Sequence, residues 1–314
     1  MKDFSSRRSV LLLFCVFSLS VWTPAASEFR ICSYNVQNFN LDKASNYRVL
    51  HTLTRIVSRC DICLLQHVVD PDGKAIGALL AALNRESERY NGHRYKSVTS
   101  TSLGNSPDDM EQYVFIFRPQ QVKVTGEHQY KGKLSFDRPP FVIRFQSTKT
   151  AINEFILVPL HSNPKKAVQE IDQLYNVFEE VSRKWNNSNV MFLGDFHAGC
   201  AYVTRKDRKS IRLYKNSNFS WLIGDRADTT VTDSTTCPYD RIVVHGEPFL
   251  KAIVPFSSQV FKFGEDFKLE KRKVLEVSDH YPLEVTLKSS APLLQATPLL
   301  ILLTVIVRFF MPTL

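Results

Sequence analysis

The sequence predicts an α/β protein in which helices cover the outer faces of β-sheets, because strand-like and helix-like segments are intermingled along the chain. The strand-like segments are short runs rich in Val, Ile and Phe. The clearest helix is 165–185, where apolar residues recur at spacings of three and four, and further helices are expected at 47–58 and 75–84. Strands are expected at 29–35, 62–66, 113–117, 141–145, 155–160, 190–193, 241–244 and 283–287.

The composition is that of an ordinary globular protein. The chain has 314 residues, of which 44% are hydrophobic and 23% charged, and this balance excludes disordered, collagen-like and coiled-coil proteins. No internal repeat or Pro/Gly-rich linker interrupts residues 28–290, so we expect one domain there. The formal net charge of +9 is compatible with a polyanionic partner, but charge alone is weak evidence.

The first 27 residues have the pattern of a secretory signal peptide. A short basic segment precedes the apolar run 10–21, and small residues follow it, which predicts cleavage after Ser27. The alternative is a membrane anchor, but the run is shorter than the ~20 apolar residues that a spanning helix needs. We therefore expect the chain to enter the secretory pathway.

The last residues, 291–314, form a second apolar segment. Ser289, Ser290 and Ala291 are small, and the tail that follows has a continuous apolar core at 299–307, which Arg308 interrupts. This pattern predicts a glycosylphosphatidylinositol attachment signal, with a retained anchor or a functionless tail as alternatives. The expected location is the cell surface or the extracellular space.

The cysteines and glycosylation sequons also fit a secreted protein. Of six cysteines, Cys15 lies in the leader, and the odd number that remains allows at most two bridges and leaves one thiol. Cys60 and Cys63 have the spacing of a redox or metal pair, but they lie in a strand-like run and no second pair completes a zinc site. Asn186 and Asn218 begin sequons that can carry glycans if exposed.

Polar residues follow several of the predicted strands. A single histidine or aspartate after a strand is usually a cap or turn residue. In α/β folds, however, such residues gather at one edge of a sheet, where catalytic sites form. The residues in question are Asn35, Gln66, His67, His161, Asp195, Asp240, Asp279 and His280.

Together, four stretches resemble the deoxyribonuclease I family, within the wider endonuclease, exonuclease and phosphatase fold. The resemblance runs from about residue 29 to 287, and the apolar tail is similar to that of the family's membrane-anchored branch. It implies a four-layer α/β sandwich of two packed, mixed and mostly antiparallel sheets flanked by helices. The four stretches are 158–162, 194–196, 237–243 and 278–282.

The resemblance implies the hydrolysis of DNA phosphodiester bonds to 5′-phosphate and 3′-hydroxyl ends. This reaction needs a base for water, an acid for the departing oxygen, and positive charge on the phosphoryl oxygens. By resemblance, His161 and His280 are the acid/base pair. Glu111 orients His161 and Asp240 orients His280, because a carboxylate on one ring nitrogen fixes the tautomer at the other.

A divalent metal is the implied cofactor. Asp195, Asp279 and Asn35 match the residues that hold metal and phosphate in the family, and oxygen ligands of this kind suit Mg²⁺ or Mn²⁺. The family also implies a disulfide between Cys200 and Cys237.

Several positions depart from the family pattern. His67 replaces a glutamate metal ligand, and His197 replaces an asparagine. Both changes should weaken the binding of Mg²⁺, and they should weaken the binding of Zn²⁺, Mn²⁺ or Co²⁺ less. Gly199 replaces an aspartate linked to a structural Ca²⁺. Asp109 stands where a groove-contacting tyrosine is usual, and its charge should reduce affinity for DNA. Arg138 matches a phosphate-contacting arginine, with a solvated loop charge as the alternative.

Three hypotheses follow from this pattern. The first is a monomeric, surface-tethered endonuclease that acts on DNA. The second is a weakened or silent member that binds DNA without cleaving it, since His67 and His197 alter the metal site. The third is a phosphodiesterase of the same fold with a non-DNA substrate.

Overall fold

The computed structural model describes residues 28–90, 92, 94–132 and 136–290. Two six-stranded sheets pack face to face, in the orders β11-β12-β1-β2-β4-β3 and β5-β6-β7-β8-β10-β9. The strands are β1 (Phe29–Phe39), β2 (Ile62–Val68), β3 (Lys96–Thr99), β4 (Gln112–Phe117), β5 (Lys123–Gln129), β6 (Phe141–Gln146), β7 (Glu154–Pro159), β8 (Val190–Asp195), β9 (Phe219–Trp221), β10 (Asp240–His245), β11 (Gln259–Val260) and β12 (Leu283–Leu287).

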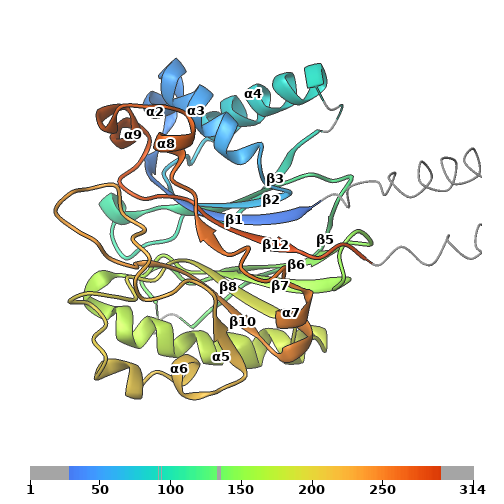
Figure 1. Ribbon diagram of the computed structural model, residues 1–314, viewed down its shortest axis with the longest axis vertical. Coiled ribbons are helices and arrows are strands. Elements are labelled where there is room, and N and C mark those ends of the chain that lie inside the picture. Colours follow the sequence, from blue (N-terminus) through green and yellow to red (C-terminus); the bar gives the residue numbers. More distant parts are fainter. Residues whose placement is uncertain (1–27, 91, 93, 133–135, 291–314) are drawn as a thin grey trace, which may run out of the picture.

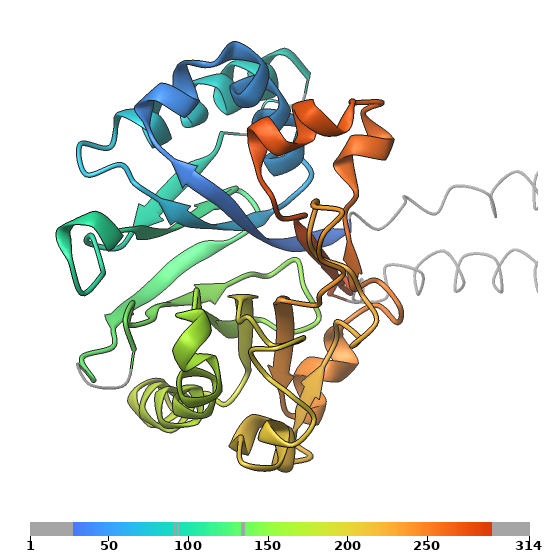
Figure 2. The same cartoon turned by 90° about the vertical axis from the view of Figure 1, so that its left-hand side faces the viewer.

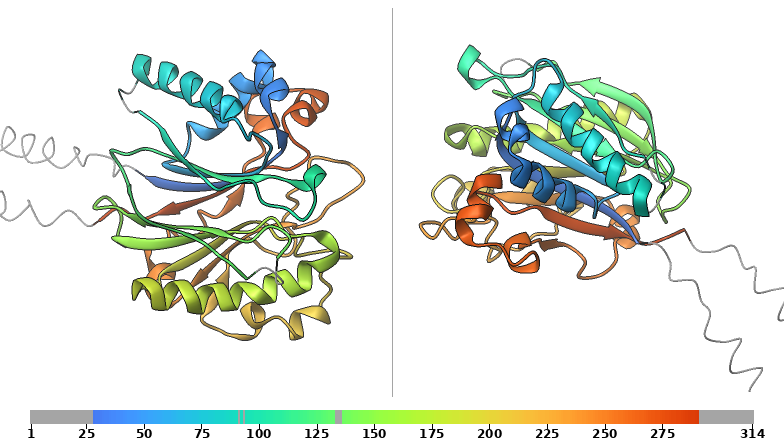
Figure 3. Two further views of the ribbon diagram at one scale, coloured as in Figure 1. Left: turned by 180° about the vertical axis from the view of Figure 1, so that it is seen from behind. Right: turned by 90° about the horizontal axis from the view of Figure 1, so that it is seen from above.

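Helices cover the outer face of each sheet, which gives the four layers that the family resemblance implied (Figure 1). Helices α2, α3, α4, α8 and α9 lie on the side of the first sheet, and helices α5 and α6 lie on the side of the second. Figures 2 and 3 show these two groups on opposite sides of the molecule. The helices are α2 (Leu41–Ser45), α3 (Tyr47–Val57), α4 (Lys74–Tyr90), α5 (Ala167–Trp185), α6 (Arg212–Lys215), α7 (Glu247–Ala252), α8 (Phe263–Asp266) and α9 (Lys271–Val277), with single turns η1 (Pro107–Asp109), η2 (Pro164–Lys166) and η3 (Asp207–Lys209).

Both sheets are mixed and mostly antiparallel, as expected. The pair β1–β2 is parallel in the first sheet and the pair β7–β8 in the second, while the other pairs are antiparallel. The two parallel pairs both run towards the same end of the sandwich, where Asn35 and Asp195 meet. The polar ends of these strands therefore converge from both sheets.

Three apolar layers hold the sandwich together. Along β4, Tyr113 and Phe115 point into the layer between the sheets, while Val114 and Ile116 point into the layer under α3 and α4. A third layer joins the second sheet to α5. Because both faces of the central strands are buried, their sequences are continuous apolar runs rather than alternating ones. This is why these runs were visible in the sequence.

Two disulfides and a buried thiol account for the cysteines of the described chain. Cys200 pairs with Cys237, as the resemblance implied, and Cys32 pairs with Cys60. Cys63 is a free, buried cysteine on β2, so the interpretation of Cys60 and Cys63 as a redox or metal pair is wrong.

The predicted leader 1–27 and the predicted tail 291–314 lie outside the described residues. Among the residues that the structure does describe, no helix combines the length and the apolar character needed to cross a membrane. The first and last described strands are neighbours, because Phe29 pairs with Leu287.

Candidate active site

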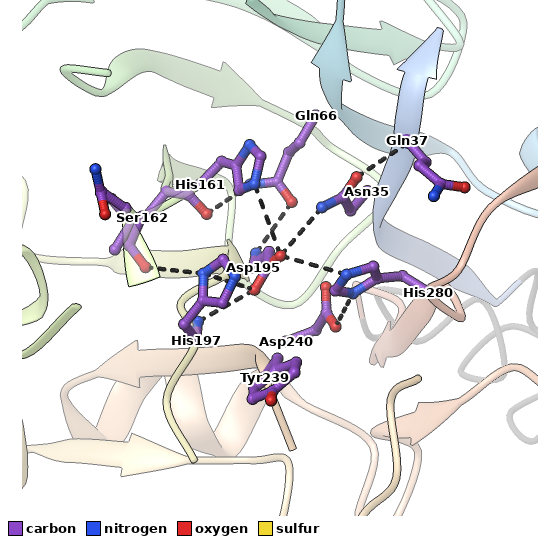
Figure 4. A network of polar contacts seen from close by, with 12 residues as sticks. Asn35, Gln37, Gln66, His161, Ser162, Asp195, His197, Tyr239, Asp240 and His280 are labelled. Atoms are coloured by element: carbon purple, nitrogen blue, oxygen red, sulfur yellow. Dashed lines mark hydrogen bonds and ion pairs between the residues drawn. The ribbon is translucent and has the colours of Figure 1, made fainter. Parts of the chain in front are cut away.

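Asp195, the last residue of β8, is the centre of a polar cluster at the junction of the two sheets (Figure 4). Its side chain is fully buried. The side-chain amide of Asn35, on β1, donates to Asp195 Oδ2 at 3.0 Å, and the backbone N–H of His197 donates to Oδ1 at 3.1 Å. A carboxylate removed from water is tolerated only with such partners.

Gln66 ties the two sheets together beneath this carboxylate. From β2 of the first sheet, its amide donates to the carbonyl of Leu160 at 2.6 Å and accepts the backbone N–H of Asp195 at 3.1 Å. Gly194 makes room for it: with φ +138°, a Cβ there would lie 2.2 Å from both Gln66 Nε2 and the Leu160 oxygen. Only glycine fits this crossing.

His161 and Glu111 form the first histidine–carboxylate pair. His161 Nδ1 lies 2.5 Å from Glu111 Oε1, and both side chains are buried. The hydroxyl of Tyr113 accepts the backbone N–H of His161 at 2.9 Å and donates to the carbonyl of Arg138 at 3.2 Å. The ring is therefore fixed through its backbone and its Nδ1, which leaves Nε2 turned towards Asp195.

His280 and Asp240 form the second pair, with His280 Nδ1 2.8 Å from Asp240 Oδ2. Ser278 accepts the backbone N–H of His280 and donates to the carbonyl of Asn35, while Thr229 accepts the backbone N–H of Asp240. These hydroxyls hold the pair in register with β1.

Both imidazoles face the same oxygen. His161 Nε2 lies 3.8 Å and His280 Nε2 lies 3.6 Å from Asp195 Oδ2. The two histidines come from different sheets, so the arrangement exists only because the sheets pack at this junction. It places two imidazole nitrogens beside one carboxylate oxygen.

The charges in the cluster reinforce one another. Burial opposes protonation of His161, but the charge and hydrogen bond of Glu111 outweigh it and raise the pKa of His161. For His280, burial is likewise outweighed by Asp240 and Asp195, which raise its pKa to about 10. Burial also opposes ionisation of Asp195, yet the surrounding imidazoles hold its pKa well below the usual range. The neighbouring carboxylates therefore favour the charged form of both imidazoles.

His67 and His197 share an unusual backbone. Their φ angles are +58° and +48°, in the left-handed region where polar residues such as His and Asn are enriched. The His197 ring lies parallel to that of His161 at 6.1 Å, and the His67 ring lies 5.3 Å from His161 on another side. Burial lowers the pKa of both, so they are neutral imidazoles, the form that ligates metals.

Two groups of side chains offer possible metal ligands among the described residues. In each group the ligand atoms lie within 4.8 Å of one another. The group Asp195, Asp240 and His280 is rich in carboxylate oxygen and fits a hard divalent ion such as Mg²⁺ or Mn²⁺. The second group is His67, Glu111 and His161.

The remaining predicted metal ligands lie around these groups. Asn35 turns its amide nitrogen to Asp195, and its oxygen accepts the backbone N–H of Gln37. Asp279 is partly exposed, with Oδ1 4.0 Å from His280 Nε2. His197 Nδ1 is 3.4 Å from Asp195 Oδ1 and 3.2 Å from the hydroxyl of Ser162.

Arg138 lies inside the site rather than in solvent. Its guanidinium contacts Asp109 at 2.8 Å and Glu111 at 2.9 Å. The side chain is mostly buried, so its interpretation as a solvated loop charge is wrong. Asp109 therefore forms an ion pair with the guanidinium of Arg138 at the site.

The predicted sequons lie away from the cluster. Asn186 is exposed at the end of α5, before the start of β8, whereas Asp195 ends that strand. Asn218 is exposed just before β9, which pairs with the opposite end of β10 from Asp240.

Sequence reasoning missed the residues that support the site. They carry no charge and lie in or beside apolar runs. The one signal in the sequence that could have identified them is a polar side chain at a position where the pattern predicts a buried residue. They are Tyr113, Ser162, Thr229 and Ser278.

The chain is similar to known proteins over most of its length. Residues 32–280 match the model of the Endonuclease/Exonuclease/phosphatase family. The chain is 39% identical to human deoxyribonuclease gamma over 91% of this chain and 93% of that protein. It is 42% identical to deoxyribonuclease-1 of Sus scrofa over 90% of this chain and 99% of that protein. The chain belongs to the deoxyribonuclease I family.

Solved structures at low identity share the fold. Humanized D. rerio TDP2 superposes with a TM-score of 0.56 at 14% identity, covering 83% of this chain and 98% of that one. The human Nocturnin catalytic domain with bound sulfate gives 0.55 at 14% identity, covering 83% and 94%. This family member therefore has the sandwich of the wider superfamily.

Replacing Gln66 with leucine should destabilise the protein by about 2–6 kcal/mol, because the buried carbonyl of Leu160 and N–H of Asp195 would each lose a partner worth ~1–3 kcal/mol. Denaturant unfolding measures this loss. Gln129→Leu makes the same exchange at a partly exposed position on the edge strand β5, where water can replace the lost partners. Equal losses in the two variants would contradict the account.

The free energy of unfolding should fall as the pH rises from 7 to 10. Because the folded-state pKa of His280 is raised to about 10, its charge stabilises the fold below the unfolded pKa, and this contribution is lost as the pH approaches 10. One such group contributes at most about 1.4 kcal/mol per pH unit. The slope should be smaller in His280→Gln and unchanged in His51→Gln on the outer helix α3; identical slopes in all three proteins would refute it.

Proposed function

We propose that this protein is an endonuclease that hydrolyses DNA phosphodiester bonds with a divalent metal, leaving 5′-phosphate and 3′-hydroxyl ends. The observation that carries the proposal is the pair of histidine–carboxylate dyads, from two sheets, whose Nε2 atoms face one oxygen of Asp195. Deoxyribonuclease relatives near 40% identity support DNA as the substrate.

The residues of the chain divide the work of hydrolysis. A phosphate in the space beside Asp195 would lie between His161 and His280, so one imidazole can take the proton of water and the other can protonate the departing 3′ oxygen. Glu111 and Asp240 orient the rings and stabilise their charged forms. Arg138 supplies positive charge for a phosphoryl oxygen.

Asp195 would hold the metal, with Asn35 and Asp279 beside it. When bound, Mg²⁺ or Mn²⁺ would neutralise charge that develops on the phosphoryl oxygens. The oxygen-rich ligand set supports these ions over softer ones at this group.

We further propose that the protein acts as a monomer at the cell surface or outside the cell. A signal peptide at 1–27 and a glycosylphosphatidylinositol signal in 291–314 would place it there. Phe29 and Leu287 are paired at the end of β1 opposite Asn35, so an anchor near Ser290 would leave the site facing away from the membrane. Exposed Asn186 and Asn218 are available for glycans.

A second candidate is a weakened member that binds DNA with little cleavage. Two observations favour it. By the family resemblance, the neutral imidazole of His67 stands in place of a carboxylate metal ligand, and Asp109 forms an ion pair with Arg138. Nothing among the described residues specifically favours a non-DNA substrate.

Conversion of supercoiled plasmid to the nicked form tests the two candidates. The protein should nick DNA with Mg²⁺ or Mn²⁺, and His161→Ala should lower the rate by about 100–10,000-fold, the usual contribution of an acid/base group. His245→Ala, at the far end of β10, is the matched histidine control. If no metal supports nicking but His67→Glu with His197→Asn restores it, the silent-member candidate holds instead.

Removing the charge of Asp109 should strengthen DNA binding, because Arg138 would become free for a phosphate. In Asp109→Asn, the affinity for a short duplex in EDTA should rise, and the plot of log affinity against log salt should steepen by about 0.9, the value for one added phosphate contact. Asp108→Asn is the control, because it removes the same charge from the same turn and the ion pair of Arg138 is with Asp109 instead. Equal effects of the two variants would show a general charge effect and sink the specific role of Asp109.

A further inference from the structure

Three side chains from separate parts of the chain meet beside the acid/base pair. His67 is the residue before the last in strand β2, Glu111 directly precedes β4, and His161 follows β7. Their ligand atoms lie within 4.8 Å of one another.

The donor set is that of a borderline metal ion. Two imidazole nitrogens and one carboxylate oxygen, completed by water, are a common ligand set for Zn²⁺, with bonds of about 2.0–2.2 Å. Tetrahedral ligands at that distance lie about 3.3 Å apart, so the three side chains need to move only modestly to close around an ion. Mg²⁺ prefers oxygen and would bind this set poorly.

The side chains also have unused ligand atoms. Within the part of the chain that the structure describes, neither ring nitrogen of His67 has a hydrogen-bond partner, although the centre of its ring lies 5.3 Å from that of His161. Among the described residues, the Glu111 side chain forms ion pairs with His161 and Arg138, and both are made through Oε1. Its Oε2 is therefore available to an ion.

Arg138 is a permanent cation beside this group, and it opposes a second positive charge. Its guanidinium, however, is paired with Glu111 and also with Asp109. Arg138, Asp109 and Glu111 together carry one net negative charge, which favours the binding of a divalent cation beside them. Asp109, which weakens phosphate binding in the proposed function, would here support the metal.

We propose that His67, Glu111 and His161 form a binding site for Zn²⁺, distinct from the Asp195 group, and that the bound ion blocks hydrolysis. The ion would occupy a lone pair of His161 and an oxygen of Glu111, and an imidazole ligated to a metal cannot exchange the proton that catalysis requires. The blocking effect rests on the proposed function, whereas the site itself does not.

The direct test is metal binding by the full chain purified from expressing cells, without DNA. The probes are Zn²⁺ in titration calorimetry and Co²⁺, whose visible absorption distinguishes four-coordinate from six-coordinate sites. Wild-type protein should bind one equivalent of either ion at this site. His67→Gln should weaken binding by more than about 100-fold, since even loss of an outer partner of a ligand costs 10–100-fold. His197→Gln, which removes a histidine whose ring lies 6.1 Å from that of His161 and outside the three-residue group, should retain the site.

Thermal unfolding checks that the variants are folded and gives a second readout. Zn²⁺ should raise the midpoint of wild type and His197→Gln but not of His67→Gln. Equal binding by His67→Gln, equal loss in His197→Gln, or no binding by the wild type would each overturn the site. In plasmid nicking with Mg²⁺, Zn²⁺ should inhibit wild type and spare His67→Gln; inhibition of both would overturn the blocking role. If the wild type binds Zn²⁺ at this site but never nicks DNA, the site stands and the proposed function fails.

Discussion

The carboxylate of Asp195 is buried at the junction of two sheets, and much of the structure serves to keep it charged there. An uncompensated carboxylate in such a place would take up a proton. Asn35 from one sheet and the backbone of His197 from the other supply hydrogen bonds, and His161 and His280 bring positive charge. The same imidazoles that stabilise the anion are those placed for acid and base chemistry.

The two sheets are held in register by groups that do no chemistry. Gln66 crosses from the first sheet to the second, Gly194 leaves the space for it, and Ser278 links His280 to the end of β1. The apolar layer between the sheets provides most of the attraction but specifies no register by itself. Buried hydrogen bonds with fixed lengths set the position of one sheet on the other, and so the distance between the two histidines.

The α/β class and the central strands could be predicted from the sequence, because strands buried on both faces are continuous apolar runs. Strands with a solvent-facing side were missed, as in the polar edge strand β5 (Lys123–Gln129). Helix α4 extends to Tyr90, beyond the predicted end at Asn84, through charged residues that carry no apolar pattern. The central site residues His161, Asp195, Asp240 and His280 could be predicted, since each lies at or near an end of an apolar strand and within a family motif. Contacts such as Gln66 with Leu160, 94 residues apart, depend on how the sheets stack, which local patterns do not encode.

The most direct test of the hydrolytic account is the chemistry of the cut ends. Plasmid nicked by the purified protein with Mg²⁺ or Mn²⁺ is freed of metal and protein and then treated with DNA ligase, which seals only nicks that carry a 5′-phosphate and a 3′-hydroxyl. The account predicts that the nicks appear only with a divalent ion and are sealed. Nicks that resist sealing, or nicking that persists in EDTA, would contradict metal-dependent hydrolysis at Asp195.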